Sequence, residues 1–182
     1  MKTVFLIVGR TASGKDSIVK TVAKDFNLKI LKSYATRPIR TDDPKDIEAH
    51  TYITSEEVEQ YKDKMIAYTK IGDYEYFSTV DQLKEIDFYI IDPQGIEFMK
   101  NYQLNDINIR IVYIYVPEHI RKERALKLRG DKLEVYEKRN LKEMEQFNNF
   151  EQMKEWDYKI VNYSLEDSIR ELKNIIIQED LL

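Results

Sequence analysis

The feature that most constrains the fold is a short loop near the start of the chain, between an extended and a helical segment. Residues 3–8 form an apolar run rich in β-branched residues, which is typical of a buried strand. From residue 15 the apolar side chains recur at helical spacing until about residue 26. The connecting loop is bounded by Gly9 and Gly14. This order predicts a strand–loop–helix unit of a parallel α/β sheet.

The loop also carries the chemistry of a phosphate site, because residues 9–15 match G-x-x-x-x-G-K. The glycines let the backbone turn tightly so that successive N–H groups face one point, and the following helix start adds partial positive charge. The lysine can reach the outer phosphates of a nucleotide. The sequence therefore predicts a P-loop that binds ATP through Gly9, Ala12, Ser13, Gly14, Lys15, Asp16 and Ser17.

Asp16 departs from the usual form of this motif. The motif has Ser or Thr after the lysine, and its hydroxyl binds Mg²⁺. A carboxylate at this position can hold the ion directly or through water, although its charge also repels nearby phosphates. Ser17 follows one position too late for the same role. We expect the Mg²⁺ site at Asp16.

The rest of the chain continues the alternation of strands and helices. Helical spacing extends from Pro117 to about residue 154, with a break at Gly130-Asp131, and a last amphipathic helix covers residues 165–177. Gly72-Asp73 separates two extended segments and predicts a β-hairpin. Further strands are predicted at residues 28–31, 87–91, 109–116 and 158–161. This alternation predicts a mostly parallel sheet.

Composition narrows the range of functions. The 182 residues have a formal net charge of −4, which gives no general basic surface for nucleic acid. The chain has no cysteine and two histidines, so disulfides, thiolate catalysis and cysteine-based zinc sites are excluded. No window approaches the roughly 18 apolar residues that a membrane span needs. We expect one cytoplasmic domain without a membrane or nucleic-acid partner.

A second motif occupies residues 33–40, Ser-Tyr-Ala-Thr-Arg-Pro-Ile-Arg. It resembles the S-x-x-T-R-x-x-R signature of guanylate kinases, in which two arginines clamp the phosphate of the monophosphate acceptor. Guanidinium groups suit this task because they bind phosphate oxygens in pairs. The resemblance implies that Ser33, Arg37 and Arg40 bind the acceptor. Taken without the P-loop, the segment would be interpreted as a solvated basic loop.

Later segments resemble the same family in the same order. The Tyr-Phe-Ser-Thr sequence that begins at Tyr76 resembles its Y-G-S-T, which implies that Tyr76 contacts the acceptor phosphate and Ser78 the base. An Ile-Asp-Pro-Gln-Gly sequence resembles its I-D-x-Q-G and implies a role for Asp92 at the acceptor. A late Val-Asn resembles the pair that borders the adenine of ATP and implies a donor contact from Asn162. Asp92 also ends a predicted strand, where open α/β sheets bind ligands.

The charged stretch after Pro117 resembles the lid of the family, whose arginines close over the donor phosphates. Arg124 lies one residue out of register with its nearest counterpart and is expected at the ATP site. Arg121 is interpreted as part of the solvated face of a helix. The matches of R-G and K-R imply that Arg129 and Arg139 close over the reacting phosphates. Together with Lys15 of the P-loop and Arg37 of the acceptor motif they are the expected catalytic residues.

Two positions depart from the family at the acceptor. His50 stands where the family has a phosphate-binding tyrosine; it can still donate a hydrogen bond, or it can serve only to cap its loop. The family's guanine-reading glutamate, nine residues before the tyrosine, corresponds to Ala67, and no glutamate lies between Glu59 and Glu75. Either Asp92 alone recognises guanine, or a nearby polar side chain such as Tyr68, Thr69 or Asp73 substitutes, or the base differs.

The resemblance implies a P-loop NTPase three-layer α/β fold with a mostly parallel sheet, a small NMP-binding lobe containing a β-hairpin, and a helical lid. One kinase domain is expected, with its core at 1–32, 80–125 and 155–182, the lobe at 33–79 and the lid at about 126–154. The implied function is ATP- and Mg²⁺-dependent phosphorylation of GMP or dGMP. The alternatives are a non-catalytic guanylate-kinase-like binding module and a kinase for a different or modified nucleotide.

Overall fold

A computed structural model describes residues 1–41 and 50–179. Residues 42–49 of the predicted lobe and residues 180–182 of the predicted core lie outside this described part. In the part described, no helix is both long and apolar enough to cross a membrane.

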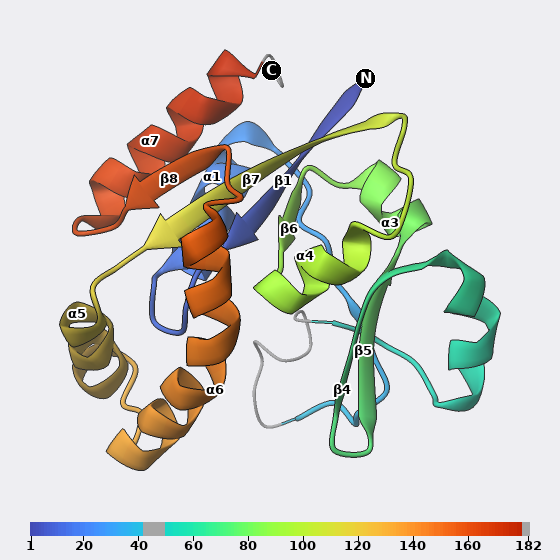
Figure 1. The fold of residues 1–182 in the computed structure, drawn as a ribbon, viewed down its shortest axis with the longest axis horizontal. Coiled ribbons are helices and arrows are strands. Elements are labelled where there is room, and N and C mark those ends of the chain that lie inside the picture. The colour runs from blue at the N-terminus through green and yellow to red at the C-terminus, as the bar shows by residue number, and fades with distance from the viewer. Residues whose placement is uncertain (42–49, 180–182) are drawn as a thin grey trace.

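The central sheet is fully parallel and has the order β6 (Phe88–Ile90), β1 (Lys2–Val8), β7 (Ile107–Tyr115) and β8 (Tyr158–Val161), as Figure 1 shows. The prediction of a parallel α/β sheet is confirmed. The strand predicted at residues 28–31 is reduced to one isolated bridge between Ile30 and Phe88. The chain passes the edge of the sheet there without running along it.

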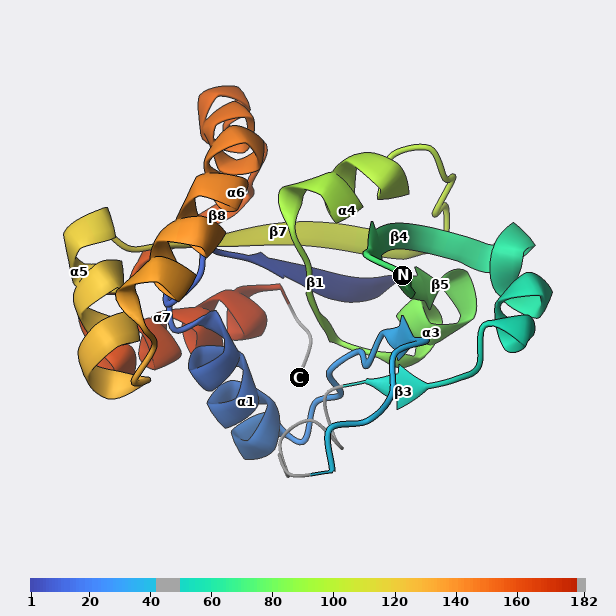
Figure 2. The same cartoon turned by 90° about the horizontal axis from the view of Figure 1, so that it is seen from below.

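Helices cover both faces of this sheet, which produces three layers (Figure 2). Phe5 and Ile7 point to the layer of α1 (Lys15–Phe26) and α7 (Leu165–Gln178). The intervening residues of β1 point to the layer of α4 (Pro93–Met99) and α6 (Leu133–Met153). Alternation of side chains along an apolar strand buried on both faces explains the arrangement. The predicted three-layer fold is confirmed.

A second, mixed sheet forms a separate lobe. Its strand order is β3 (Thr51–Tyr52), β2 (Tyr34–Ala35), β5 (Tyr74–Thr79) and β4 (Met65–Ile71). The predicted hairpin is confirmed, since β4 and β5 pair antiparallel around the turn at residues 72–73. A 3₁₀ segment, η1 (Glu56–Lys64), covers this sheet, with packed rings of Tyr34, Tyr61, Tyr68 and Phe77 between them. Helix α3 (Val80–Glu85) leads back to the core.

The helical stretch after Pro117 consists of α5 (Glu118–Glu123), a π-helical turn η2 (Arg124–Leu128), and α6. The predicted break is confirmed, because residues 129–132 separate η2 from α6 and Gly130 has φ +75°. The end of α6 packs on the sheet through Phe147 and Phe150, which are buried in the core.

Candidate functional site

Three adjoining cavities follow the carboxyl ends of the central strands. We call them the loop cavity (about 470 Å³), the central cavity (about 350 Å³) and the hairpin cavity (about 130 Å³). Lys15 lines both the loop and the central cavity. Thr69 and Asp92 line both the central and the hairpin cavity. Shared walls join the three cavities into one continuous site between the P-loop and the hairpin.

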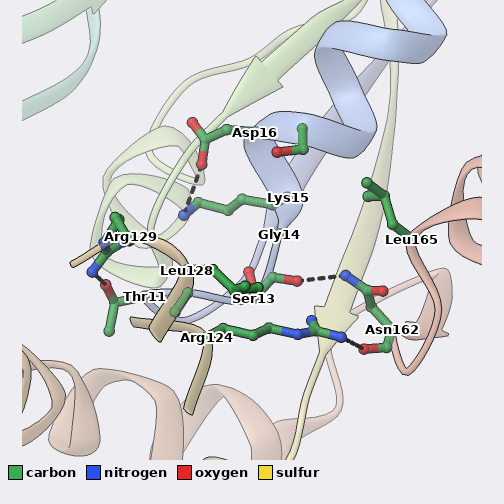
Figure 3. A pocket seen from close by; sticks show the side chains of 12 residues that line it. Thr11, Ser13, Gly14, Lys15, Asp16, Arg124, Leu128, Arg129, Asn162 and Leu165 are labelled. Atoms are coloured by element: carbon green, nitrogen blue, oxygen red, sulfur yellow. Dashed lines mark hydrogen bonds and ion pairs between the residues drawn. The ribbon is translucent and has the colours of Figure 1, made fainter. Parts of the chain in front are cut away.

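The P-loop closes tightly onto β8 (Figure 3). Asn162 donates from Nδ2 to the carbonyl oxygen of Ser13 at 2.8 Å. Gly14 has φ +82°, and a Cβ there would lie 2.6 Å from Nδ2 of Asn162. Glycine is required at this position for both its backbone conformation and its lack of a side chain. The motif therefore fixes the loop against the residue that follows the last strand.

Two polar atoms in the wall of the loop cavity lack a protein partner. Among the described residues, these are the only buried side-chain atoms without a hydrogen bond: Oγ of Ser13 and Oδ1 of Asn162. Both residues are 1% exposed and both line the cavity. Buried polar groups are usually satisfied, so this pair indicates a site prepared for a polar ligand.

Lys15 and Asp16 lie at the start of α1 with their charges together. Nζ of Lys15 is 3.4 Å from Oδ2 of Asp16 (Figure 3). The Asp16 side chain is 63% exposed, so its carboxylate can rotate toward a ligand. Ser17 follows it and also lines the loop cavity.

Arg124 lines the loop cavity at the start of the π-helical turn. The N–H of Arg129 donates to the carbonyl oxygen of Arg124, five residues earlier, at 3.1 Å. A π turn accommodates one more residue than an α turn. The Arg124 guanidinium donates to the carbonyl oxygens of Asn162 and Tyr163 at 2.9 and 3.2 Å, and burial lowers its pKa.

The two predicted lid arginines share one carboxylate. Arg129 is bound by both oxygens of Asp131 and donates to Oγ1 of Thr11 at 3.4 Å. Arg139 lies 3.7 Å from Oδ2 of the same Asp131. Hydrogen bonding to Arg129 lowers the pKa of Asp131. Arg129 lines the loop cavity and Arg139 the central cavity, and Lys15 lines both.

Asp92 lies between the central and the hairpin cavity, and it also caps a helix. Its Oδ1 accepts the N–H of Gly95 at 2.7 Å and caps α4. Because one oxygen is used for the cap, the other can serve a ligand in the two cavities that Asp92 lines.

The hairpin cavity contains some of the predicted acceptor residues. Ser33 and Tyr76 line it, as does Ala67, which is buried. Ser78 lies beneath the wall, fully buried, and its hydroxyl bonds that of Tyr89 at 2.7 Å. Burial raises the pKa of Tyr89 to about 12. Tyr89, rather than Ser78, lines the cavity.

His50, Arg37 and Arg40 lie apart from the walls of these three cavities. Nδ1 of His50 is 2.9 Å from Oγ of Ser33, and its ring lies 5.6 Å from that of Tyr76. Arg37 donates to the carbonyl oxygen of Pro38 at 2.9 Å and lies over the ring of Tyr52. Arg40 is exposed in the loop that follows. His50 thus joins the acceptor residues, whereas the two arginines stand outside the cavity walls.

Sequence reasoning missed several residues around the P-loop. The interpretation of Arg121 as solvated is wrong: it is 3% exposed and donates to the carbonyl oxygens of Val116 and Thr11 and to Asn140. Glu143 and Glu151 of α6 bind Thr11 and Arg10. The contacts with Thr11 and Arg10 join positions more than 100 residues apart, and charged residues on a long helix give no signal of such pairing.

The fold and the site together define the class of protein. A parallel sheet between two layers of helices, with a P-loop at the carboxyl end of its first strand, is the architecture of P-loop α/β nucleotide-binding proteins. The chain belongs to the guanylate kinase family, whose model, described as Guanylate kinase, matches residues 1–179. Guanylate kinases are phosphotransferases, so the chain is assigned to that class of enzyme. The resemblance inferred from the motifs is confirmed.

Individual relatives agree with this assignment. The chain is 26% identical to a guanylate kinase of Buchnera aphidicola subsp. Schizaphis graminum, with 97% of this chain and 88% of that protein covered. Among solved structures it is similar to a guanylate kinase from Anaplasma phagocytophilum, with a TM-score of 0.60, 20% identity, and coverage of 98% and 87%. It also resembles TT1252 from Thermus thermophilus, with a TM-score of 0.54, 13% identity, and 98% coverage of both chains. At identities of 20% and 13%, the two solved structures support the fold of this chain alone.

Proposed function

We propose that the protein transfers the γ-phosphoryl group of ATP to GMP or dGMP. The observation that carries this proposal is the row of three joined cavities, with Lys15 at one junction and Asp92 at the other. Such a row provides a donor site, a place for the reacting phosphates and an acceptor site in sequence. In-line transfer needs this order.

The donor nucleotide would occupy the loop cavity. The loop N–H groups and Lys15 would hold its phosphates, and Arg124 and Asn162 would border its base. The unpaired oxygen of Asn162 supports a ligand hydrogen bond at this point.

Asp16 fits the role of Mg²⁺ ligand. Mg²⁺ in nucleotide sites is usually bound by one or two carboxylates together with substrate phosphates and water. The described residues contain no cluster of three or more acidic or histidine side chains that could hold a metal alone. A single exposed carboxylate beside Lys15 suits an ion that is shared with the nucleotide, and the ion would neutralise charge on the phosphates.

The acceptor would bind across the hairpin cavity, near Ser33, His50, Tyr76 and Asp92. Ser78 would act through Tyr89. Arg37 and Arg40 would bind its phosphate after the lobe at residues 33–79 closes toward the core, because they lie outside the cavity walls in the present conformation. Asp92 retains one carboxylate oxygen for guanine, and the hydroxyl-bearing Thr69 lines the same two cavities.

Catalysis would then consist of positioning and charge stabilisation. Lys15, Arg129 and Arg139 surround the junction of the loop and central cavities, where charge on the transferring group would lie. Closure of the lobe and of a lid within residues 126–154 would exclude water from the reaction.

The test is ADP formation from ATP and Mg²⁺ with GMP, dGMP, AMP, dAMP, CMP, UMP and dTMP. We expect activity with GMP and dGMP, and a loss of about 10²–10³ in kcat for Lys15→Ala. Lys20→Ala, on the exposed side of α1, is the matched control. Preference for another base would redefine the acceptor, and ADP formation that no monophosphate stimulates would contradict the kinase proposal.

A further inference from the structure

The first half of the P-loop is bound to one face of α6. The backbone N–H of Thr11 donates to both carboxylate oxygens of Glu143, at 2.8 and 3.1 Å. Thr11 is 8% exposed, so this N–H has little access to solvent as an alternative partner. A buried backbone donor needs an acceptor, and the structure supplies it from a helix more than 100 residues later.

The neighbouring loop residue is held in the same way. Arg10 forms two hydrogen bonds of 3.2 Å with the carboxylate of Glu151 and one of 3.2 Å with Oδ1 of Asn148. Its guanidinium lies over the ring of Phe147 at 5.0 Å, and Glu151 also accepts the hydroxyl of Tyr113. The four contacting positions of α6, spaced at 4, 5 and 8 residues from Glu143, share one helix face.

Glu143 also lines the central cavity with Lys15 and Arg139. A carboxylate there has two opposite effects on a bound nucleotide. Its charge repels phosphate, whereas its hydrogen bonds hold Thr11 and thereby the N–H groups of the residues that follow. The cations of the same cavity reduce the repulsion, and the charge of the carboxylate strengthens the hydrogen bond that it accepts, so we take the hydrogen bond as the stronger effect.

We propose that Glu143 is a positioning residue of the P-loop. It holds the Thr11 N–H so that the loop is already shaped for phosphate before the nucleotide arrives, and the Arg10–Glu151 pair restrains the same segment from the side. This inference rests on the proposed function only in that the loop binds ATP. It predicts that substitution of Glu143 weakens binding of the donor nucleotide and leaves binding of the acceptor unchanged.

The experiment measures equilibrium binding of Mg·ADP and of GMP, separately, by calorimetry. Glu143→Ala is expected to weaken ADP binding about tenfold, because the N–H loses its acceptor. Glu143→Gln retains one carbonyl oxygen as acceptor and is expected to restore most of the affinity. Glu145→Ala, an exposed residue of the same helix, is the matched control and is expected to bind ADP like the parent protein. GMP affinity and the melting temperature are expected to change little in all three.

ADP binding by Glu143→Ala at parental or greater strength would overturn the proposal, since the carboxylate would then act only by repulsion. Equal weakening of ADP and GMP together with a lower melting temperature would also overturn it, because that pattern indicates a purely structural role. If Glu143→Ala does not fold, Arg10→Met provides the second test, with weaker ADP binding and unchanged GMP binding expected. Failure of the parent protein to bind ADP would instead contradict the proposed function.

Discussion

At the scale of the single residue, Asp16 has the most direct consequence for catalysis. It replaces a hydroxyl with a charged group that lies 3.4 Å from Lys15 and faces the loop cavity. In the absence of metal the carboxylate neutralises the lysine that should meet the phosphates. In the proposed function, Asp16 would be a ligand of Mg²⁺ and would then leave the lysine to the nucleotide. We therefore expect binding of the donor nucleotide to depend on the metal.

We expect Asp16→Ala to raise the Mg²⁺ concentration for half-maximal activity by roughly 10–100-fold, because losing a group that supports the ion has effects of that size. Asp16→Ser should recover part of this loss, since a hydroxyl is the usual ligand at the position. Initial rates at fixed ATP over a titration of free Mg²⁺ measure the effect. An unchanged titration curve in Asp16→Ala would show that the carboxylate does not serve the metal.

The site residues that could be predicted are those whose chemistry is local in the sequence. The P-loop glycines, Lys15 and Asn162 lie where the motifs indicated, because short motifs fix backbone geometry within a few residues. Glu143 and Arg121 could not be predicted. Each acts through a single contact with the P-loop from a distant helix, and only the packing of the layers determines which charged residue of that helix points inward.

At the scale of the element, the π-helical turn η2 determines the position of the lid arginines. The turn contains one more residue than an α-helical turn, and π turns of this kind often occur at functional sites. Arg124 at its start faces the loop cavity, and Arg129 immediately after it reaches Thr11 and Asp131. The extra residue therefore lets both side chains face the P-loop.

Insertion of one alanine after Lys127 tests this role of the turn. Each residue added to a helix turns the residues after it by about 100°, so the insertion is expected to rotate Arg129 relative to Arg124. Arg129 would then lose Thr11, and we expect kcat to fall by about 10²-fold with little change in melting temperature. Lys127→Ala is the control, because it places alanine in the exposed part of the turn and keeps the residue count. Equal activity of the two variants would contradict this interpretation.

Element prediction succeeded where the hydrophobic pattern was long. The strand at 158–161, the hairpin and the last helix lie at or within a residue or two of the predicted bounds. The prediction of a strand at residues 28–31 was wrong, because four apolar-rich residues suit a strand or an extended connection equally well. In the structure this segment forms only one bridge with the edge of the sheet. The π turn could not be predicted, since its sequence has ordinary helical spacing.

At the scale of the whole molecule, the site is formed between parts that contribute separate walls. The core supplies the loop cavity, the hairpin lobe supplies the cavity at the other end, and α6 borders the space between them. The carboxyl ends of parallel strands predicted this general location. The continuity of the cavities could not be predicted, because it depends on how the second sheet is oriented against the first.

Ligands that bridge these parts should stabilise the entire protein. We expect ADP and GMP, each at 100 times its Kd, to raise the free energy of unfolding by about 2.7 kcal/mol. For a chain of this size the melting temperature should rise by roughly 5–10 °C with each ligand. Thermal melting with ADP, GMP, AMP, and ADP with GMP measures the effect. A shift with AMP and none with GMP would contradict guanine as the acceptor base.

Helix α6 has a mechanical consequence. Its first half packs on α5 through buried Tyr136 and Asn140, and its second half packs on the sheet through Phe147 and Phe150. Arg139 lies about three turns before Glu151, ~18 Å along the helix axis. If α6 and α5 tilt together by about 10° around Glu151, Arg139 moves by ~3 Å, which is about the length of one hydrogen bond. In the proposed function, a small displacement at the P-loop would thereby become contact, or loss of contact, between Arg139 and the transferring phosphate.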